Sequence, residues 1–593
     1  MPVSLRPAPL FLLATYLFLS LTPFIGLPIS SLEQIVGPLT VTVVGWIGLW
    51  AVCKRPAYFH SLLLPVFLVI PIQIYLQLYF HQSLSTHHLG LIAETSPREA
   101  FEFLGNKVWA LIGIELLITM WWIATLLIAW RNHAFDWRGK SRWLVVAIMI
   151  AVLALFQYGV VAGFASTASS SSTVAKTNPD AHLPPLPRWV KPTALDSVDL
   201  GEAWPFGVFV HGYHFWKERQ YLARLADASR TFRFGAFSNA AKDEEQTIVM
   251  VIGESGRYDR WSLNGYERQT TPLLQAEPNV VSLTDIVTPI SATRLSVPVI
   301  VSRKPATASL QAEFNEKSFI SAFKEAGFKT YWLSNQMSFG QFDTPVSVYA
   351  NEADVTAFLN VGSMSRGSDF DQVLLKPLHN AVNDSAKKKL IVLHVLGSHW
   401  NYSHRYPPAF DRWQPSLLGI DKPAYTDLKI KQQLNNSYDN SILYTDWFLS
   451  EVVHELKSVN AITTMMYVAD HGQTLYDGTC QFAFHGHNTQ FEFHIPAVVW
   501  YSDRYLASYP DKVAQLLRNR RAKLSTENIF DSLLDMADVH TPSERLDYSF
   551  FSRNWRPHKR YVDSYGWTNY DNARVKGDCR EIIDKGKPLA REK

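Results

Sequence analysis

Hydrophobic and polar positions divide the chain into two parts of different character. After residue 246, short apolar runs rich in β-branched side chains alternate with longer amphipathic stretches, whereas the N-terminal part carries much longer apolar runs. The long runs lie at about 9–29, 35–53, 59–80, 108–130 and 143–165. Each approaches the ~20 residues with which a helix crosses a bilayer. The pattern predicts an N-terminal α-helical membrane domain of five transmembrane helices over residues 1–166.

Basic residues predict how these helices are oriented. Arg6 precedes the first run, Lys54 and Arg55 follow the second, and the segment between the fourth and fifth is rich in arginine and lysine. Because such loops stay on the cytoplasmic side, we expect the N-terminus in the cytoplasm and the chain after Ser166 outside it. The first run resembles a signal peptide, but no small-residue cleavage site follows it, so we interpret it as an anchor. Glu115 lies in the fourth run, where an ionisable group is either functional or near enough to the outer end to reach water.

Residues 167–245 form a predicted linker and bridging helix. Serine-rich and then proline-rich sequence between residues 169 and 187 favours a flexible piece followed by a stiff one. The aromatic, amphipathic stretch from Trp204 to about Leu225 predicts a surface helix. It either lies on the membrane or packs on the soluble part of the chain.

The alternating pattern predicts an α/β domain over residues 246–566. Strand-like runs lie at 247–252, 328–333, 389–396, 464–469 and 495–501, with helical stretches such as 438–457 between them. This alternation favours a mainly parallel central sheet covered by helices on both faces. Residues 567–593 are polar and charged, and we expect them to form a peripheral or loose tail.

Two of the predicted strands end in residues that suit a metal site. Glu254 follows the run 247–252 after one glycine, and Asp470 and His471 follow the run 464–469. The carboxyl ends of parallel strands meet at one edge of a sheet, so these side chains are expected to converge on a metal ion there. Such a centre also needs a nucleophile. The nearby hydroxyl candidates are Ser255, Ser291, Thr293 and Ser296.

Further short motifs extend along nearly the whole chain. They are 253–255 (Gly-Glu-Ser), 262–266 (Ser-Leu-Asn-Gly-Tyr), 270–272 (Thr-Thr-Pro), Thr293 with 296–298 (Ser-Val-Pro), His394 with His399, 438–440 (Tyr-Asp-Asn), 470–472 (Asp-His-Gly) and 485–486 (His-Gly). In this order the set resembles the phosphoethanolamine transferases of the bacterial envelope. That family includes the lipid A-modifying, polymyxin-resistance enzymes of the alkaline phosphatase and sulfatase superfamily. The resemblance implies a sulfatase- or alkaline-phosphatase-like fold after residue 246.

The resemblance also implies a zinc centre and its nucleophile. Its metal ligands would be Glu254, Thr293, Asp470 and His471, with Thr293 as the attacking hydroxyl. One Zn²⁺ is expected, and a second is left open because glutamine, a poorer zinc ligand, stands at position 473 where many relatives have glutamate. A second cluster, for substrate or another zinc, comprises His394, His399, Gln473 and His485. Of these, His399 or His485 would protonate the leaving group, and His394 is alternatively a histidine of the strand interior.

The outer segment 81–107 carries one more implied contact. Thr95 and Glu99 match positions that help the family to bind a lipid headgroup, whereas the family's asparagine is replaced by Leu91. Helix capping by Thr95 explains that residue equally well.

Other conspicuous residues have structural explanations as well. The run 257–260 (Arg-Tyr-Asp-Arg) is either a solvated helix face or a group that orients the site. The histidines expected to be structural or exposed are His404, His487 and His494. Of the three cysteines, Cys53 ends an apolar run, whereas Cys480 and Cys579 could form a disulfide.

The function that the resemblance implies is zinc-dependent group transfer at the bacterial inner membrane, with the catalytic domain in the periplasm. Thr293 would take phosphoethanolamine from phosphatidylethanolamine, and the phosphothreonine intermediate would pass it to lipid A or another lipopolysaccharide-core or envelope-glycan acceptor. We expect a multi-pass monomer, and the net charge of +3 indicates no nucleic-acid partner.

Three alternatives compete with this function. A phosphoglycerol transferase would share the fold and the metal. A hydrolase of the phosphatase or sulfatase type would use water as acceptor, but a sulfatase needs arginine two residues after its proline, where Ile300 stands. A non-catalytic relative would not need Glu254, Thr293, Asp470 and His471 together.

Overall fold

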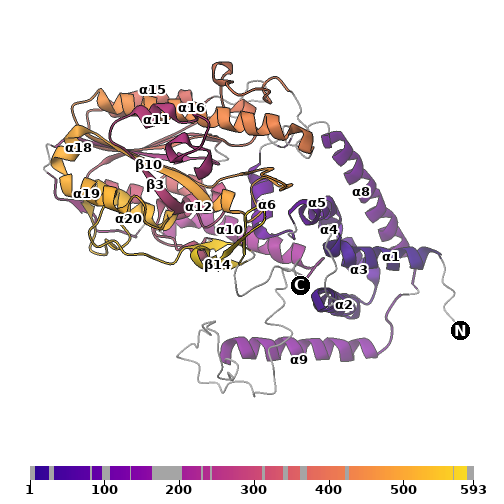
Figure 1. The fold of residues 1–593 in the computed structure, drawn as a ribbon. Helices are drawn as coiled ribbons and strands as arrows, with labels where there is room; N and C mark the ends of the chain where they lie inside the picture. Colours follow the sequence, from indigo (N-terminus) through magenta and orange to yellow (C-terminus); the bar gives the residue numbers. More distant parts are fainter. Residues whose placement is uncertain are drawn as a thin grey trace. The chain divides into compact units, whose positions relative to one another are not determined.

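The chain forms two compact units in the computed structural model (Figure 1). One comprises Met1–Ile92, Asn106–Trp216 and Ala590–Lys593, and the other Ala93–Gly105 and Lys217–Leu589. The structure describes residues 7–25, 33–80, 83–95, 100, 104, 107–133, 135–162, 203–228, 231–240, 244–309, 314–337, 345–360, 370–420, 427–564 and 566–583.

The regular secondary structure in the described residues of the first unit is all helical. Its helices are α1 Pro7–Leu21, α2 Glu33–Cys53, α3 Pro56–Ser61, α4 Leu64–Leu68, α5 Ile70–Phe80, α6 Thr86–Glu94, α8 Lys107–Arg131, α9 Ser141–Ala162 and the first half of α10 Gly207–Ala228. Buried His60 of α3 ties neighbouring helices together, since its ring nitrogens lie 3.1 Å from the Tyr16 hydroxyl of α1 and 2.9 Å from the Thr125 hydroxyl of α8.

The described helices fit only part of the predicted five-span pattern. Two of them, Pro7–Phe24 and Lys107–Arg131, are long and apolar enough to cross a membrane, and the apolar parts of α2 and α9 are shorter. The run 59–80 is not one helix but three, α3, α4 and α5. Pro65 in the first turn of α4 explains one break, because proline lacks the N–H that would continue a preceding helix. On α8, Leu116 and Leu117 are 61% and 63% exposed, as expected of a helix surface in contact with lipid.

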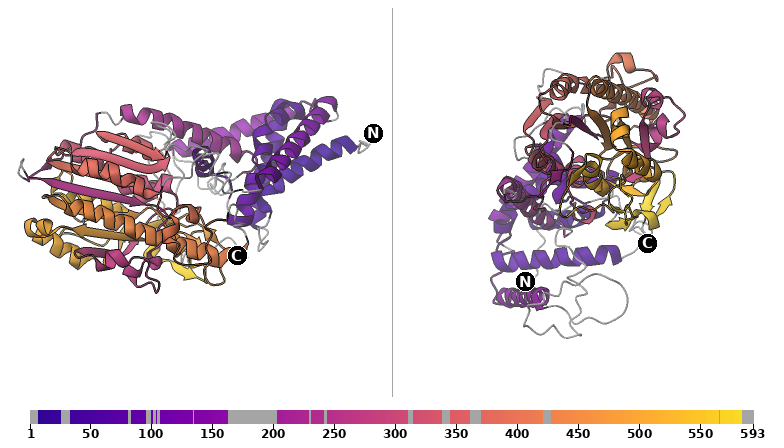
Figure 2. Two further views of the ribbon diagram at one scale, coloured as in Figure 1. Left: turned by 90° about the horizontal axis from the view of Figure 1, so that it is seen from above. Right: turned by 90° about the vertical axis from the view of Figure 1, so that its left-hand side faces the viewer.

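The second unit is built on one eight-stranded sheet (Figure 2, left). Its strands are β2 Gln246–Gly253, β3 Val280–Val287, β4 Lys329–Met337, β5 Val355–Asn360, β6 Lys388–His394, β7 Ile462–Ala469, β10 His494–Tyr501 and β11 Leu524–Ser525, in the order β11-β3-β10-β7-β2-β6-β4-β5. Only β10 is antiparallel to its neighbours, so the prediction of a mainly parallel sheet is confirmed. The central strands β2, β6 and β7 are buried along their whole length, which explains their continuous apolar sequence.

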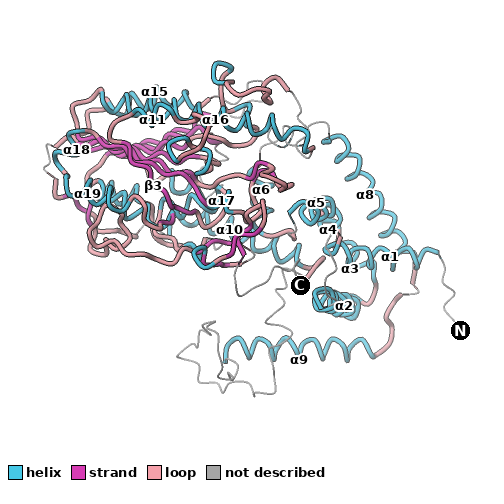
Figure 3. The backbone as a smooth tube through the Cα atoms, viewed as in Figure 1, coloured by secondary structure: helices cyan, strands magenta, loops and turns pink. Residues whose placement is uncertain are grey.

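Helices cover both faces of this sheet, as predicted. One layer contains α11 Pro272–Ala276, α15 Leu375–Val382 and α16 Lys431–Lys457, and the other contains α12 Thr293–Val301, α19 Pro510–Asn519 and α20 Ile529–Met536. Figure 3 shows the strands of the second unit as one layer between these helices. The expected helix 438–457 is the C-terminal part of α16, which begins seven residues earlier, at Lys431.

The end of the chain is more ordered than its polar sequence predicts. Up to Ile583 it forms the hairpins β13 Tyr561–Asp563 with β14 Trp567–Asn569 and β15 Arg574–Lys576 with β16 Glu581–Ile583. Ile582 is 1% exposed and packs with Phe493 and Val562. Of the two expected forms of this segment, peripheral or loose, the loose one is wrong for the described residues from 567 to 583.

A disulfide between Cys480 and Cys579 fastens this C-terminal segment. It closes a long loop, with a sequence separation of 99, and cross-links of this kind stabilise by restricting the unfolded chain. We expect Cys579→Ser to lower the free energy of unfolding by about 2–5 kcal/mol. Urea unfolding of the full chain in detergent measures this loss of stability. Cys53→Ser, at the free cysteine of the helical unit, is the matched control, and equal stability of the two variants would contradict the prediction.

Candidate metal centre and nucleophile

The register of the central sheet brings the predicted ligands together. Gly253 at the end of β2 lies opposite Ala469 at the end of β7, so the next residues, Glu254 and Asp470, leave the sheet side by side. The Asp470 N–H donates to the Gly253 carbonyl at 2.9 Å, which continues the pairing past the strand ends. Glu254 is 1% exposed and Asp470 is fully buried.

Glu254, Asp470 and His471 form the one group of metal-ligating side chains found among the described residues. One ligand atom from each lies within 4.8 Å of the others. His471 Nε2 is 3.4 Å from Glu254 Oε1 and 3.5 Å from Asp470 Oδ2. His471 Nδ1 lies 2.9 Å from the Gly472 carbonyl, which can only accept, so Nδ1 carries the proton and the lone pair of Nε2 faces the carboxylates.

The electrostatics of this group favour a bound cation. Burial raises the pKa of the Glu254 carboxyl well above its usual value, and the neighbouring Asp470 charge raises it further. Asp470 Oδ2 is buried and has no hydrogen-bond partner in the structure. Unpaired buried carboxylate oxygens are costly, and a metal ion would satisfy this one. Two carboxylates, an imidazole and a hydroxyl are a donor set that zinc accepts.

Thr293 is the hydroxyl that the structure places against these ligands. It opens α12, and its Oγ1 lies 3.0 Å from Glu254 Oε2 and 3.4 Å from His471 Nε2. Among residues 291–301 it alone is half-buried, and the others are buried. A helix N-terminus also favours the negative charge of a phosphate.

Each of the other hydroxyl candidates has a hydrogen-bond partner of its own. Ser255 Oγ donates to Glu254 Oε1 at 2.6 Å. Ser291 Oγ accepts from the Gly486 N–H at 3.3 Å, and fully buried Ser296 lies with its Oγ 3.5 Å from the Thr293 carbonyl.

The second predicted cluster reaches the centre only in part. Fully buried Gln473 bonds Ser255 Oγ at 2.8 Å, and its Oε1 lies 3.3 Å from His485 Nδ1. The His485 ring lies 4.5 Å from that of His471, centroid to centroid. Gln473 and His485 therefore border the ligands.

The other two residues of this cluster, His394 and His399, lie at the end of β6 and in the loop after it. His394 ends β6, and burial lowers its pKa to about 4 while the Asp470 charge raises it. Its Nε2 is buried without a hydrogen-bond partner in the structure. His399 is half-buried, and its Nδ1 lies 2.7 Å from the Trp400 carbonyl.

Of the two residues predicted to contact the lipid headgroup, only Thr95 is among the described residues. Thr95 is exposed and directly follows α6, whose last residue is Glu94. Glu99 lies outside the described residues.

Three further histidines have structural partners, as expected. His487 stacks on Phe482 at 4.5 Å, and His494 stacks on Tyr258 at 4.1 Å. His404 Nε2 lies 3.5 Å from the Asn401 side-chain nitrogen.

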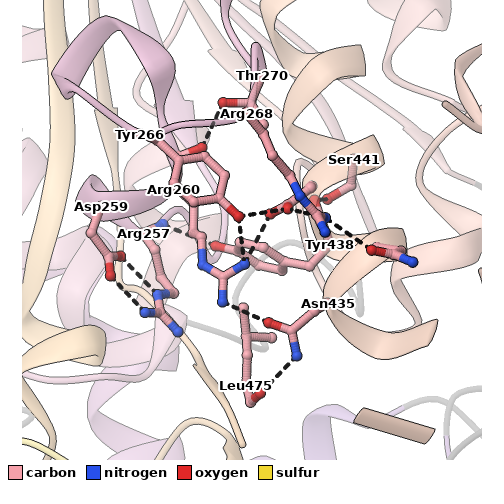
Figure 4. A network of polar contacts seen from close by, with 12 residues as sticks. Arg257, Asp259, Arg260, Tyr266, Arg268, Thr270, Asn435, Tyr438, Ser441 and Leu475 are labelled. Carbon is pink, nitrogen blue, oxygen red and sulfur yellow. Dashed lines mark hydrogen bonds and ion pairs between the residues drawn. The ribbon is translucent and has the colours of Figure 1, made fainter. Parts of the chain in front are cut away.

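The run 257–260 forms a hydrogen-bond and ion-pair network around the buried Arg257 rather than a solvated helix face (Figure 4). Arg257 is 1% exposed and pairs with Asp259 at 2.7 Å and Asp477 at 2.9 Å. The Arg257 N–H donates to the Tyr438 hydroxyl at 2.9 Å, and that hydroxyl donates to the Ser255 carbonyl at 2.6 Å. The network thus supports the turn that carries Glu254, which is the other interpretation of this run.

Sequence reasoning missed two residues that hold the site. Gln336, near the end of β4, donates to Glu254 Oε2 at 3.2 Å and to the Val395 carbonyl at 2.9 Å. Asp371 accepts from the Leu396 and Gly397 N–H groups at 2.8 and 2.9 Å, which fixes the loop after β6. Neither belongs to a recognisable motif. Position at a strand end was the one available signal for Gln336.

Glu492 holds the loop that carries His485. Its carboxylate accepts from the Gly486 N–H at 2.8 Å and the His487 N–H at 3.0 Å, and burial raises its pKa to about 7. Between pH 4.5 and 7 the folded state therefore keeps a proton that the unfolded state releases, so this group's contribution to stability falls as pH rises. We expect Glu492→Gln, which does not titrate, to gain on wild type across this window by at most about 3 kcal/mol. Unfolding at pH 5 and pH 8 measures the gain, and parallel pH profiles would contradict it.

The second unit is similar in sequence to proteins that are already known. Residues 246–539 match the family model described as Sulfatase. Phosphoethanolamine transferase EptC of Escherichia coli is 29% identical over 330 residues, covering 52% of this chain and 54% of the relative. Kdo(2)-lipid A phosphoethanolamine 7''-transferase of Salmonella typhimurium is 30% identical over 332 residues, covering 53% and 55%. The chain thus spans about half the length of these curated relatives. The resemblance seen in the motifs is confirmed, and the sulfatase-family domain is a catalytic fold.

Two solved structures extend the comparison. The C-terminal periplasmic domain of EptC from Escherichia coli, in complex with Zn, aligns with a TM-score of 0.51 at 25% identity, over 58% of this chain and 98% of that one. The integral membrane protein lipooligosaccharide phosphoethanolamine transferase A from Neisseria meningitidis aligns with a TM-score of 0.62 over 91% of this chain and 98% of that one. Its identity of 19% supports a shared fold, membrane part included, and no more.

Proposed function

We propose, from the premise that residues 246–539 form a sulfatase-family domain related to phosphoethanolamine transferases, that this protein is itself such a transferase. It moves phosphoethanolamine from phosphatidylethanolamine to lipid A or another lipopolysaccharide or envelope-glycan acceptor. One observation carries the proposal. The Thr293 hydroxyl, at a helix N-terminus, lies 3.0 Å from a carboxylate of the buried Glu254, Asp470 and His471 group.

The proposed setting is the bacterial inner membrane. Five transmembrane helices over residues 1–166 would anchor a monomer with its N-terminus in the cytoplasm. Residues 167–245 would lead to a periplasmic catalytic domain over 246–566, followed by the C-terminal segment 567–593. The exposed apolar surface of α8 and the shared fold with a membrane relative support an anchor of this kind. Holding the site at the leaflet that contains both lipids explains why a transferase would keep a membrane domain.

The proposed cofactor is one Zn²⁺ held by Glu254, Asp470, His471 and Thr293. The donor set fits zinc, and the EptC domain of similar fold was crystallised with Zn. Bound zinc would lower the pKa of the threonine hydroxyl and so activate it at neutral pH. Gln473 is committed to Ser255 and carries no charge, which argues against a permanent second ion.

The chain's own residues suggest two steps. Thr293 Oγ1 loses its proton to solvent and forms a bond to the phosphorus of the donor, and the bond from phosphorus to the diacylglycerol oxygen breaks. The departing oxygen takes a proton, for which His485 is better placed than His399, since its ring contacts His471. In the second step an acceptor hydroxyl or phosphate oxygen attacks the same phosphorus, the bond from phosphorus to Thr293 Oγ1 breaks, and Thr293 Oγ1 takes a proton again.

The donor is tested with zinc-loaded, full-length protein in proteoliposomes. Release of diacylglycerol from phosphatidylethanolamine, but not from phosphatidylglycerol, is the expected result, with chelator-treated protein as control. Release from phosphatidylglycerol instead would establish the alternative phosphoglycerol transferase. Steady release of free phosphoethanolamine whether or not lipid A is present would indicate a hydrolase.

A further inference from the structure

Gln473 occupies the centre of a chain of hydrogen bonds that the proposed steps leave unused. It is fully buried, two residues after His471, at the start of the short hairpin of β8 Thr474–Leu475 and β9 Ala483–Phe484. Its Nε2 lies 2.8 Å from Ser255 Oγ, and its Oε1 lies 3.3 Å from His485 Nδ1. Ser255 Oγ lies 2.6 Å from Glu254 Oε1.

The direction of these bonds follows from what each group is able to donate. With a cation bound, Glu254 is ionised and can only accept, so Ser255 gives it its one hydroxyl proton. Ser255 Oγ then accepts, and the side-chain NH₂ of Gln473 supplies that donor. The Gln473 carbonyl oxygen is left facing His485, where only an N–H satisfies it. His485 therefore carries a proton on Nδ1.

Further hydrogen bonds fix the position of Ser255, so that it can link Gln473 to Glu254. Its N–H donates to Asp470 Oδ1 at 3.0 Å, and its carbonyl accepts from the Tyr438 hydroxyl at 2.6 Å. Its φ of 58° lies in the left-handed region, which a non-glycine residue keeps only where its surroundings impose it. Since Ser255 bonds Oε1 of Glu254 and Thr293 bonds Oε2, the two carboxylate oxygens have different partners.

We propose that Gln473 is a positioning residue and does not bind substrate. Through Ser255 it fixes the side chain of the ligand Glu254, and through its carbonyl it fixes the ring and the proton of His485. The part that the His485 ring plays in the reaction rests on the proposed transferase function, whereas the orientation of Glu254 does not.

The test is a double-mutant cycle on zinc binding. The dissociation constant is measured by chelator competition on the full chain in detergent, for wild type, Ser255→Ala, Gln473→Ala and the double variant. Supporting contacts to metal ligands are worth about 10–100-fold in affinity. We expect each single variant to weaken zinc binding by about 10-fold and the double variant by no more than either, because both break one chain. Gln490→Ala, at a glutamine that bonds Tyr570 in the same unit, is the control and should leave the affinity unchanged.

Two other results would overturn the inference. Multiplying effects in the double variant would mean that Ser255 and Gln473 act independently, and unchanged zinc affinity would mean that Gln473 does not reach the ligand. Gln473→Met is nearly the same size and keeps the proposal testable if the alanine variant fails to fold. It removes the donor to Ser255 and the acceptor for His485, and we expect it to weaken zinc binding about as much as the alanine variant does.

Kinetics separate this inference from the proposed function. A positioning role predicts that Gln473→Ala lowers kcat and leaves KM for the lipid donor within about twofold, because uniform substrate binding is untouched. A rise in KM with kcat unchanged would make Gln473 a substrate-binding residue. Wild-type protein that binds zinc but releases nothing from any phospholipid would refute the proposed function, and the zinc cycle would still decide the role of Gln473.

Discussion

Replacing Thr293 by alanine is expected to abolish headgroup transfer, with a fall in kcat of about 10³-fold or more, as for the loss of other catalytic nucleophiles. Thr293 Oγ1 is the hydroxyl 3.0 Å from Glu254 and 3.4 Å from His471 Nε2, and α12 holds it there. Single-turnover release of diacylglycerol from phosphatidylethanolamine measures the loss. Thr293→Ser, which keeps a hydroxyl on a less restricted side chain, should retain part of the rate.

The rival hydroxyls of the same segment provide the controls. Ser291→Ala and Ser296→Ala remove hydroxyls that hydrogen-bond backbone groups, so we expect each to keep the rate within about tenfold of wild type. If either serine variant lost as much as Thr293→Ala, or if Thr293→Ala stayed active, the nucleophile would have to be reassigned.

Asp470→Asn is expected to have the second largest effect on transfer. The same substitution should not destabilise the metal-free protein. Asparagine keeps Oδ1 for the Ser255 and His471 N–H groups, at 3.0 and 2.7 Å in wild type, but it removes one of two buried negative charges. Metal binding and transfer should both be lost. The metal-free variant should unfold at the same temperature as metal-free wild type or higher, because the repulsion that raises the pKa of Glu254 is gone.

Metal analysis and thermal unfolding with and without zinc test this pair of expectations. Zinc at 100 times its dissociation constant should stabilise wild type by about 2.7 kcal/mol and the variant not at all. Asp446→Asn is the matched control, since Asp446 is another mostly buried acid, with its pKa raised to about 7 by burial, and it accepts from Leu273 and Leu274 N–H groups instead. Zinc-induced stabilisation of Asp470→Asn equal to that of wild type would remove Asp470 from the ligands.

The sequence predicts the positions of those site residues that the central sheet alone places. Glu254 and Asp470 each follow a continuous apolar strand, and in a parallel sheet the register of Gly253 with Ala469 puts both at one edge. The ligands and the strand order around them therefore follow from short-range pattern plus topology. Thr293 is different. Four hydroxyls lay within reach on sequence, and family resemblance, not spacing, favoured the one that faces the ligands.

Contacts between distant segments could not be predicted from the sequence. Arg257 looks solvated in a charged run, but it is buried and its partner Asp477 lies 220 residues away. Gln336 and Asp371 support the site from segments that carry no motif. In the helical unit, composition alone predicted one span over 59–80, whereas proline at position 65 begins a new helix. The polar C-terminal segment is ordered by a disulfide and by Ile582, features too sparse to show in a hydropathy pattern.

In the proposed function, Thr293 carries phosphoethanolamine from the donor lipid to the acceptor. Mass spectrometry of zinc-loaded full-length protein incubated with phosphatidylethanolamine, without acceptor, tests this role most directly. We expect a phosphoethanolamine adduct on the peptide that contains residue 293, in wild type and not in Thr293→Ala. An adduct at another residue, or diacylglycerol release with no adduct at any point in the time course, would contradict it.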